Sequence, residues 1–265
     1  MSCGPFALIG VVGPMARTVA DLKALFANMQ GPDAGDACAA PVPLRWPTGH
    51  ELKKLKVGYF EEDGRTPVVP EIRQAVRTAA EALNRAGFSV EPFCPSNLEA
   101  ARQLWKKFFV KMGGMLIDPM FRGRESDRSP IMEQFLDWSA AEPELTADSL
   151  LDAWIQRDVV RAEFLAQMTQ YPILLCPPAA IAAFRHGERS WTIEGKTVNY
   201  LDAWSYTEWF NLLGNPAAVV PVSSTSDGLP VGVQIVGRPW EEEQVLGVAA
   251  VLEQECGGWR KPPLC

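Results

Sequence analysis

The spacing of apolar residues is most regular in the first half of the chain. Residues 55–60 form a short strand-like run, and residues 70–86 place their apolar side chains on one face of a helix. Pro70 suits the first turn of that helix, and Gly87 suits the position just after its end. A second strand-like run occupies residues 88–91. Strand, helix and strand in this order predict a βαβ unit with parallel strands.

The remaining segments show the same helical and strand-like spacing of apolar residues. Thr18 with Asp21 can cap a helix that ends at Gly31-Pro32, and Ser96 with Glu99 forms a capping box before another helix. Further helices are predicted at residues 130–139, 147–170 and 202–213, and from Pro239 onward. Strands are predicted at 171–176, 217–222 and 231–236, with a hairpin at 190–198 that turns at Glu194-Gly195.

The two last strands decide the predicted fold class. Residues 217–222 and 231–236 are almost continuously apolar, which suits interior strands of a sheet covered on both faces. A polar loop at 223–230 joins them. We therefore expect an α/β fold with a mixed, largely buried β-sheet flanked by helices on both faces. Residues 32–53 are rich in proline and form a possible internal linker.

Composition and charge narrow the function classes. The 265 residues are 47% hydrophobic and 22% charged, which is an ordinary globular composition. The net charge of −7 and the pI near 5.0 argue against a nucleic-acid partner, because phosphate binding depends on clustered Lys and Arg. No G-x-G-x-x-G or Walker sequence follows the first strand, so the βαβ unit gives no indication of nucleotide binding.

Targeting signals and metal motifs are also absent from the sequence. No apolar run approaches the roughly 18–20 residues that span a membrane, and no signal peptide is visible. Six cysteines are scattered without a C-x-x-C pair, which favours reduced thiols and a cytoplasmic location. With only two histidines, zinc spacing is absent, and we expect neither a metal site nor a cofactor.

Segments at both ends of the chain resemble a known family. Residues 211–222 read Asn-Leu-Leu-Gly-Asn-Pro-Ala-Ala-Val-Val-Pro-Val, and residues 227–240 read Asp-Gly-Leu-Pro-Val-Gly-Val-Gln-Ile-Val-Gly-Arg-Pro-Trp. Near the start, Gly-Pro-Phe-Ala at 4–7 precedes Val-Gly-Pro-Met-Ala-Arg-Thr-Val-Ala-Asp at 12–21. Together these runs resemble the amidase signature family, the Ser-Ser-Lys hydrolases of carboxylic amides. The resemblance implies the C-terminal half of the amidase signature fold.

The resemblance also implies which groups are missing. In that family a Ser attacks the amide carbonyl, and a second Ser relays its proton to a neutral Lys. The family places these residues, and the Gly-rich oxyanion hole, before the point that corresponds to residue 1. We therefore expect residues 1–265 to form a partial domain with no catalytic residue. The only Ser cluster, residues 223–226, is interpreted as a solvated turn.

Five residues are candidates for substrate binding. Pro177 and Pro178 close a strand that, by the resemblance, points toward the substrate; they could equally be strand terminators. Asn211 and Gly214 lie where the family packs a helix against the acyl pocket, although Gly214 also suits a helix C-cap. Trp209 shares its predicted helix with other aromatic residues, which suits either a partly wet pocket or the core.

Other residues also allow two interpretations. Trp204 and Tyr206 belong to the same aromatic helix, and the apolar stripe within residues 104–112 could line a pocket or simply face the core. Arg238 could bind a substrate carboxylate, but an Arg at a strand end more often forms a structural ion pair. His186 lies in a polar segment and is interpreted as a surface residue.

The resulting hypothesis is the C-terminal portion of an amidase that works through a Ser-Ser-Lys acyl-enzyme and is inactive as this isolated chain. Two alternatives stay open: a fragment of the A-type subunit of a glutamyl-tRNA amidotransferase, and a non-catalytic binding or scaffold module that pairs with a separate catalytic half. The expected partners are a small-molecule amide in the full-length protein, and either a second copy of the chain or a catalytic half. Exposed sheet edges left by a partial domain would promote such association.

Overall fold

The computed structural model describes residues 9–33, 35 and 39–261. Five strands form one sheet in the order β2-β1-β3-β7-β6. Their bounds are Lys56–Tyr59 for β1, Ser89–Pro92 for β2, Ile173–Cys176 for β3, Ala217–Ser224 for β6 and Pro230–Val236 for β7. β1 is parallel to β2 and β3, whereas β7 is antiparallel to β3 and β6. The predicted mixed sheet is confirmed.

The βαβ unit is also confirmed. β1 and β2 are parallel, and helix α4, Pro70–Arg85, connects them. Pro70 occupies the first turn of α4, and Gly87 follows its end with a φ of +94°. The apolar face of α4 is buried in the core, including Val76 and Leu83. Local periodicity and the two terminal residues were therefore sufficient to predict this unit.

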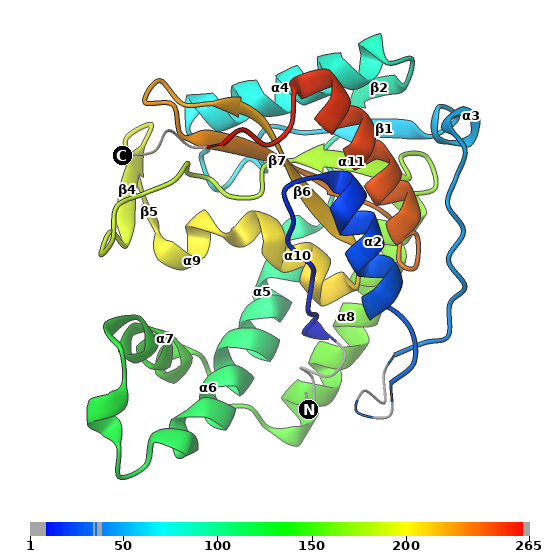
Figure 1. Ribbon diagram of the computed structural model, residues 1–265. Helices are drawn as coiled ribbons and strands as arrows, with labels where there is room; N and C mark the ends of the chain where they lie inside the picture. Colours follow the sequence, from blue (N-terminus) through cyan, green and yellow to red (C-terminus); the bar gives the residue numbers. More distant parts are fainter. Residues whose placement is uncertain (1–8, 34, 36–38, 262–265) are drawn as a thin grey trace.

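Helices cover both faces of the sheet (Figure 1). α4 and α11 lie along one face, and α5, α8, α9 and α10 lie on the other. Besides α4, the α-helices that lie wholly within the described residues are α2 (Val19–Met29), α3 (Gly49–Leu52), α5 (Leu98–Trp105), α6 (Met112–Ile117), α7 (Pro130–Ala141), α8 (Ala147–Gln167), α9 (Tyr200–Ala203), α10 (Ser205–Leu213) and α11 (Glu242–Cys256). A π-helical turn, η1 (Lys106–Lys111), joins α5 to α6, and the short 3₁₀ turns η2 (Asp118–Phe121) and η3 (Glu125–Asp127) follow.

A separate hairpin stands beside the main sheet. β4, Ser190–Ile193, pairs antiparallel with β5, Lys196–Asn199. The turn places Glu194 at a φ of +52° and Gly195 at +76°, which is the type of backbone that a tight two-residue hairpin requires. The hairpin and its predicted turn are confirmed.

The structure corrects the predicted environment of strand β6. It is an edge strand of the described sheet, not an interior one, and Val219 on it is 49% exposed. The strand also extends through Ser223 and Ser224, with a register shift after Pro221, so these two serines pair with β7. The turn itself is limited to residues 225–229. Apolar composition predicted the strand but could not show which side lacks a neighbour.

Three predicted helix boundaries were wrong. Ser96 and Glu99 form no capping box; Asn97 precedes α5 with a φ of +64°, and the Ser96 amide instead donates to Gln167 on α8. Pro239 does not begin the last helix, which starts at Glu242. The predicted helix at 202–213 is divided at Trp204 into α9 and α10.

The possible linker at residues 32–53 carries one short helix, α3, capped reciprocally by Thr48 and Glu51. Its role as a boundary between units stays a prediction. The Gly-Pro-Phe-Ala run at 4–7 lies outside the described residues. Cys94, Cys176 and Cys256 are free thiols in the described part of the chain. Within that part, no helix has the length and apolarity to cross a bilayer, and no cluster of His, Cys, Asp or Glu is arranged to hold a metal ion.

Candidate substrate-binding site

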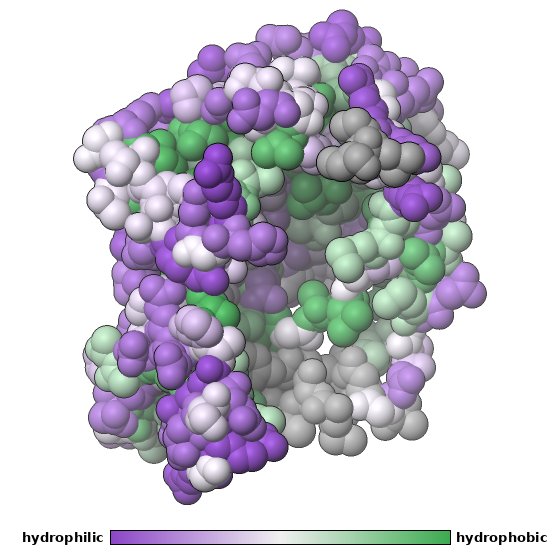
Figure 2. Space-filling view, turned by 60° about the vertical axis from the view of Figure 1, so that its left-hand side comes forward, coloured by the Kyte–Doolittle hydropathy of each residue, from purple (hydrophilic) through white to green (hydrophobic). Residues whose placement is uncertain are grey.

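A crevice of about 450 Å³ lies where α9 and α10 meet α5. Its lining residues are Trp105, Tyr200, Leu201, Trp204, Thr207, Glu208 and Asn211. Figure 2 shows that one face of the molecule is hollowed, with hydrophobic residues visible within the hollow. The volume lies within the range of small-molecule sites, and the lining combines aromatic rings with a few polar groups, as such sites do.

Aromatic rings form one wall of the crevice. The Tyr200 and Trp204 rings lie 6.2 Å apart in an edge-on arrangement, and Phe184 contacts both at 6.3 Å. On the opposite helix, Trp105 stacks on Phe109 with ring centroids 5.1 Å apart. Aromatic pairs of this geometry add about 0.5–1.5 kcal/mol each beyond the buried area. The wall is therefore held in place by packing among its own rings.

Glu208 is the charged residue of the lining. It lies on α10 among the buried residues Ser205, Trp209 and Leu212, and it is only 5% exposed. Its carboxylate makes no hydrogen bond or ion pair with any described residue. The pKa of Glu208 is raised to about 8, mainly because burial in apolar surroundings disfavours the charged form; the negative charge of Asp202 contributes in the same direction. Arg102, Lys106 and Arg65 oppose the shift.

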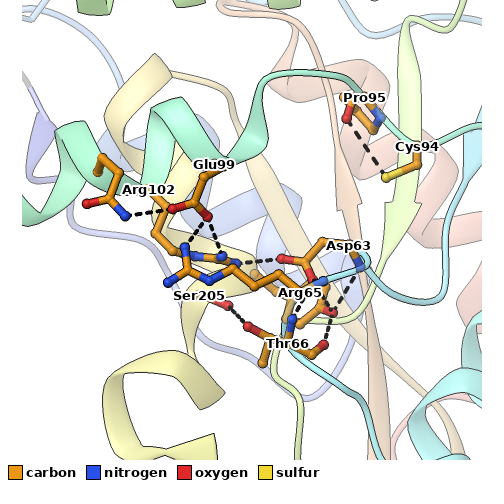
Figure 3. A network of polar contacts seen from close by, with 10 residues as sticks. Asp63, Arg65, Thr66, Cys94, Pro95, Glu99, Arg102 and Ser205 are labelled. Carbon is orange, nitrogen blue, oxygen red and sulfur yellow. Dashed lines mark hydrogen bonds and ion pairs between the residues drawn. The ribbon is translucent and has the colours of Figure 1, made fainter.

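A buried ion-pair network fixes α5 beside this crevice (Figure 3). Arg102 on α5 pairs with Asp63 in the loop after β1, and both side chains are 2% exposed. Arg102 also donates to Glu99, which in turn pairs with Arg65. These four residues carry two charges of each sign, so the network is neutral as a whole. The loop after β1 and helix α5 are thereby held together.

The same network reaches α10. Asp63 accepts hydrogen bonds from the amides of Arg65 and Thr66 at 2.9 and 2.8 Å, which closes a tight local turn. The Tyr206 hydroxyl donates to the Thr66 carbonyl at 2.7 Å, and Ser205 donates to the Thr66 hydroxyl at 3.4 Å. The two helices that form the crevice therefore share one polar anchor, the loop at residues 63–66.

The far end of α10 is fixed by α8. Arg157 and Arg161 donate from Nε to the carbonyls of Leu212 and Leu213, at 2.9 and 2.8 Å. These carbonyls lack partners within their own helix, and guanidinium donors complement the negative end of the helix dipole. Gly214 ends α10 with a φ of +76°. Both ends of the helix that carries Glu208 are therefore held by specific contacts.

Of the predicted substrate contacts, Asn211 lines the crevice. Its side-chain amide donates to the carbonyl of Ile9, so this residue also ties the N-terminal segment to α10. Trp209 is fully buried and packs in the core rather than facing the crevice. Gly214 is a helix C-cap and is exposed. Contact of Trp209 or Gly214 with a substrate stays a prediction.

The two prolines lie beyond the crevice as well. Pro177 is buried, and its carbonyl accepts from Gln234 on β7 at 3.4 Å. The same Gln234 amide donates to the Tyr206 carbonyl at 3.0 Å, which links the central sheet to the start of α10. Pro178 is half-buried and is not a lining residue. A substrate role for either proline remains a prediction.

Sequence reasoning missed Glu208. Its signal was present, because a charged residue stood among Tyr206, Trp209 and Phe210, all of which are buried. The other aromatic candidates have different places in the structure. Trp204 lines the crevice and Tyr206 is in the core. Within the stripe at 104–112, Trp105 lines the crevice, whereas Leu104 and Phe108 are buried.

Two other sequence interpretations are confirmed. Arg238 forms a two-bond ion pair with Glu241, at 2.7 and 2.6 Å, as expected for a structural role. His186 is exposed.

One buried serine and one buried lysine lie in neighbouring segments. The Ser139 hydroxyl donates to the Lys111 backbone carbonyl at 3.2 Å, and the Lys111 ammonium pairs with Glu144 at 2.9 Å. Gly114 leaves the space that Ser139 fills, since a Cβ there would lie 1.9 Å from the serine oxygen. The lysine is committed to a carboxylate, so this arrangement is a packing contact. Among the described residues, no serine hydroxyl hydrogen-bonds to a lysine amine.

We expect the buried carboxyl of Glu208 to make stability depend on pH. Its folded pKa, about 8, lies above the usual value of 4.5, so folding is favoured while the group is protonated. This contribution is fully present below about pH 4.5 and is lost as pH rises through 8. The free energy of unfolding should therefore fall more between pH 5 and pH 8.5 in the wild type than in Glu208→Gln, measured by urea denaturation. A wild-type-to-variant difference that is equal at both pH values would contradict this expectation.

Comparison with known proteins gives the class of molecule to which this fold and crevice belong. A family model described as Amidase matches residues 3–246. The A-type subunit of glutamyl-tRNA(Gln) amidotransferase from Myxococcus xanthus is 31% identical over 94% of this chain and 55% of its own length. Indoleacetamide hydrolase of Bradyrhizobium japonicum is 26% identical, over 94% of this chain and 53% of its own. The chain belongs to the amidase signature family, as the motifs predicted, and it spans about half the length of these curated relatives.

Solved structures of similar fold support the same family assignment. A protein described as part of a vestigial complex that reveals the origins of an s-triazine catabolic enzyme has a TM-score of 0.77 and 26% identity, covering 94% of this chain and 54% of its own. A bacterial aryl acylamidase of the same family has a TM-score of 0.74 and 22% identity, over 92% of this chain and 52% of its own. This second likeness concerns the fold alone. The predicted partial amidase signature fold is confirmed.

Proposed function

We propose that this chain supplies the substrate-binding wall of an amidase that hydrolyses small carboxylic amides, and that it is inactive on its own. The observation that carries this proposal is the aromatic crevice with its single buried carboxylate, formed by a chain that matches half of an amidase fold. In the complete enzyme, a Ser from the other half attacks the amide carbonyl while a Ser-Lys pair transfers the proton. This chain holds and orients the amide, which makes the attack effectively intramolecular. The chemistry requires no metal or organic cofactor.

The exposed edge of β6 supports the proposed partner. Its unpaired backbone groups and the half-exposed Val219 form a place where another strand can add. We propose that the occupant is a catalytic half of the same fold, or in its absence a second copy of this chain. A cytoplasmic location remains part of the proposal and depends on the dispersed thiols alone.

A second candidate is a role as a fragment of an A-type amidotransferase component. The relative from Myxococcus xanthus, at 31% identity, specifically favours it. The net charge of −7 counts against direct contact with RNA, since such contact relies on clustered basic residues. A scaffold role beside a separate catalytic half is the non-enzymatic alternative; one structural neighbour is described as part of a vestigial protein complex.

The test is reconstitution. We expect the purified chain to release no ammonia or amine from simple aliphatic and aromatic amides. Mixing it with the separately expressed catalytic half of a related amidase should produce turnover that neither half shows alone. Light scattering on the same samples distinguishes pairing from self-association. Turnover by this chain alone that disappears in Ser223→Ala or Ser224→Ala would overturn the proposal, as would a mixture that pairs but never hydrolyses an amide.

A further inference from the structure

The crevice contains a carboxylate without a partner. Glu208 is 5% exposed, and its carboxyl group forms no hydrogen bond or ion pair with a described residue. Buried carboxylates in proteins are nearly always paired, because an isolated buried charge costs several kcal/mol. The neighbouring acid Asp202, by contrast, accepts a hydrogen bond from Asn199 at 2.6 Å. Glu208 is therefore a site at which a ligand can supply the missing counter-charge.

The cationic groups nearest Glu208 do not pair with it. Asp63, Glu99, Arg65 and Arg102 pair with one another within their own network. Lys106 acts on Glu208 electrostatically but forms no ion pair with it. The carboxyl group of Glu208 is therefore open to a cationic ligand.

The aromatic wall suits the same kind of ligand. Trp105, Tyr200 and Trp204 line the crevice together with Glu208. A cation within about 6 Å of such a ring is attracted to its face, most strongly by tryptophan. The Tyr200 ring already makes one contact of this kind, because the Arg189 guanidinium lies 5.3 Å from its centre. The aromatic rings and the Glu208 carboxyl group line the same crevice. Together they suit an ammonium group attached to an apolar stem.

We propose that the crevice binds the ammonium group of an amine-bearing amide, with Glu208 as its counter-ion and Trp204 and Tyr200 around its stem. The proposal rests on the amide hydrolysis proposed above for the identity of the substrate, but ammonium binding itself requires only this chain. Glu208 is then a specificity-determining residue rather than a catalytic one. It selects amides whose acyl or amine portion carries a positive charge several bonds from the scissile carbonyl.

The alternative is that a protonated Glu208 donates a hydrogen bond to a neutral amide. The two possibilities predict opposite responses to pH. Because the pKa of Glu208 is raised to about 8 by burial, the carboxylate that attracts an ammonium group becomes more abundant as pH rises from 6 toward 8. A hydrogen bond from the neutral acid would weaken over the same interval. Arg102, Lys106, Arg65 and Asp202 are the charged groups that act electrostatically on Glu208.

The experiment compares two isosteric amides. 5-Aminopentanamide carries an ammonium group where hexanamide carries a methyl group. Binding to the purified chain is followed by calorimetry and by tryptophan fluorescence at pH 6, 7 and 8. We expect the wild type to bind 5-aminopentanamide at least about tenfold more tightly than hexanamide at pH 8, with the preference increasing from pH 6 to pH 8. Glu208→Gln, which keeps the shape of the side chain, should lose the preference.

The matched control is Asp202→Asn, which removes a nearby carboxylate that is not in the lining; it should keep most of the preference. Equal binding of the two amides by the wild type, a preference that survives in Glu208→Gln, or a preference that decreases toward pH 8 would each overturn the proposal. If Glu208→Gln fails to fold, the wild-type pH series still decides the question. Failure of reconstituted hydrolysis with intact ammonium binding would overturn the proposed function alone. Hydrolysis that treats charged and neutral amides equally would overturn this inference alone.

Discussion

Replacing Arg102 with Met will lower the free energy of unfolding by about 3–5 kcal/mol, because it leaves the carboxylate of Asp63 buried without its counter-ion. Both side chains of this pair are 2% exposed. Asp63 keeps its hydrogen bonds from the amides of Arg65 and Thr66, so the loss is that of the charge partner rather than of the whole turn. The measurement is guanidinium denaturation followed by tryptophan fluorescence.

The matched control is Arg65→Met. Arg65 pairs with Glu99, but the two side chains are 44% and 51% exposed, and exposed pairs contribute about 0–1 kcal/mol. The double variant Arg102→Met/Asp63→Asn should recover part of the loss, because the introduced asparagine can accept the same two amide hydrogen bonds without a charge. Equal effects of Arg102→Met and Arg65→Met would show that the buried pair does not anchor α5.

Trp209→Ala will have a comparable effect, about 3–5 kcal/mol, because it removes a fully buried ring and leaves a cavity between α10 and the sheet. The ring lies 6.2 Å from Phe60 next to β1, 5.4 Å from Tyr206 and 5.6 Å from the guanidinium of Arg102. Trp209→Phe keeps most of the volume and should cost clearly less. Urea denaturation of both variants measures the difference.

Trp204→Ala is the informative comparison. Trp204 is half-buried in the crevice, so its loss should disturb ligand binding more than folding. If Trp209→Ala destabilised the chain no more than Trp204→Ala, the assignment of Trp209 to the core would be wrong. Its predicted contact with substrate would then gain support.

The sequence predicted those parts of the fold that local chemistry decides. The βαβ unit followed from Pro70 and Gly87 at the two ends of an amphipathic helix, and the hairpin followed from Glu194-Gly195. The sequence-based prediction was wrong where a contact with a residue distant in the sequence determines the local structure. The Ser96 amide is satisfied by Gln167, and Glu99 is engaged by Arg65 and Arg102, so neither was free to cap α5.

The same distinction applies to the residues of the candidate site. Trp204 and Asn211 were recognisable as candidates because aromatic residues and a family motif pointed to that helix. Glu208 was missed, because its burial depends on how α5 packs against α10. That packing is fixed by the loop at residues 63–66, far away in the sequence. A charged residue among buried aromatic neighbours was the one signal available.

The polar anchor has a consequence for engineering. Among the described residues, every contact that fixes Arg102 is made by a residue between 63 and 209. The polar anchor is thus internal to one segment of the chain. The Asn211 side chain, which also lines the crevice, donates to Ile9 outside that segment, so a transplanted piece meant to carry ligand preference must include Ile9 as well as residues 55–256.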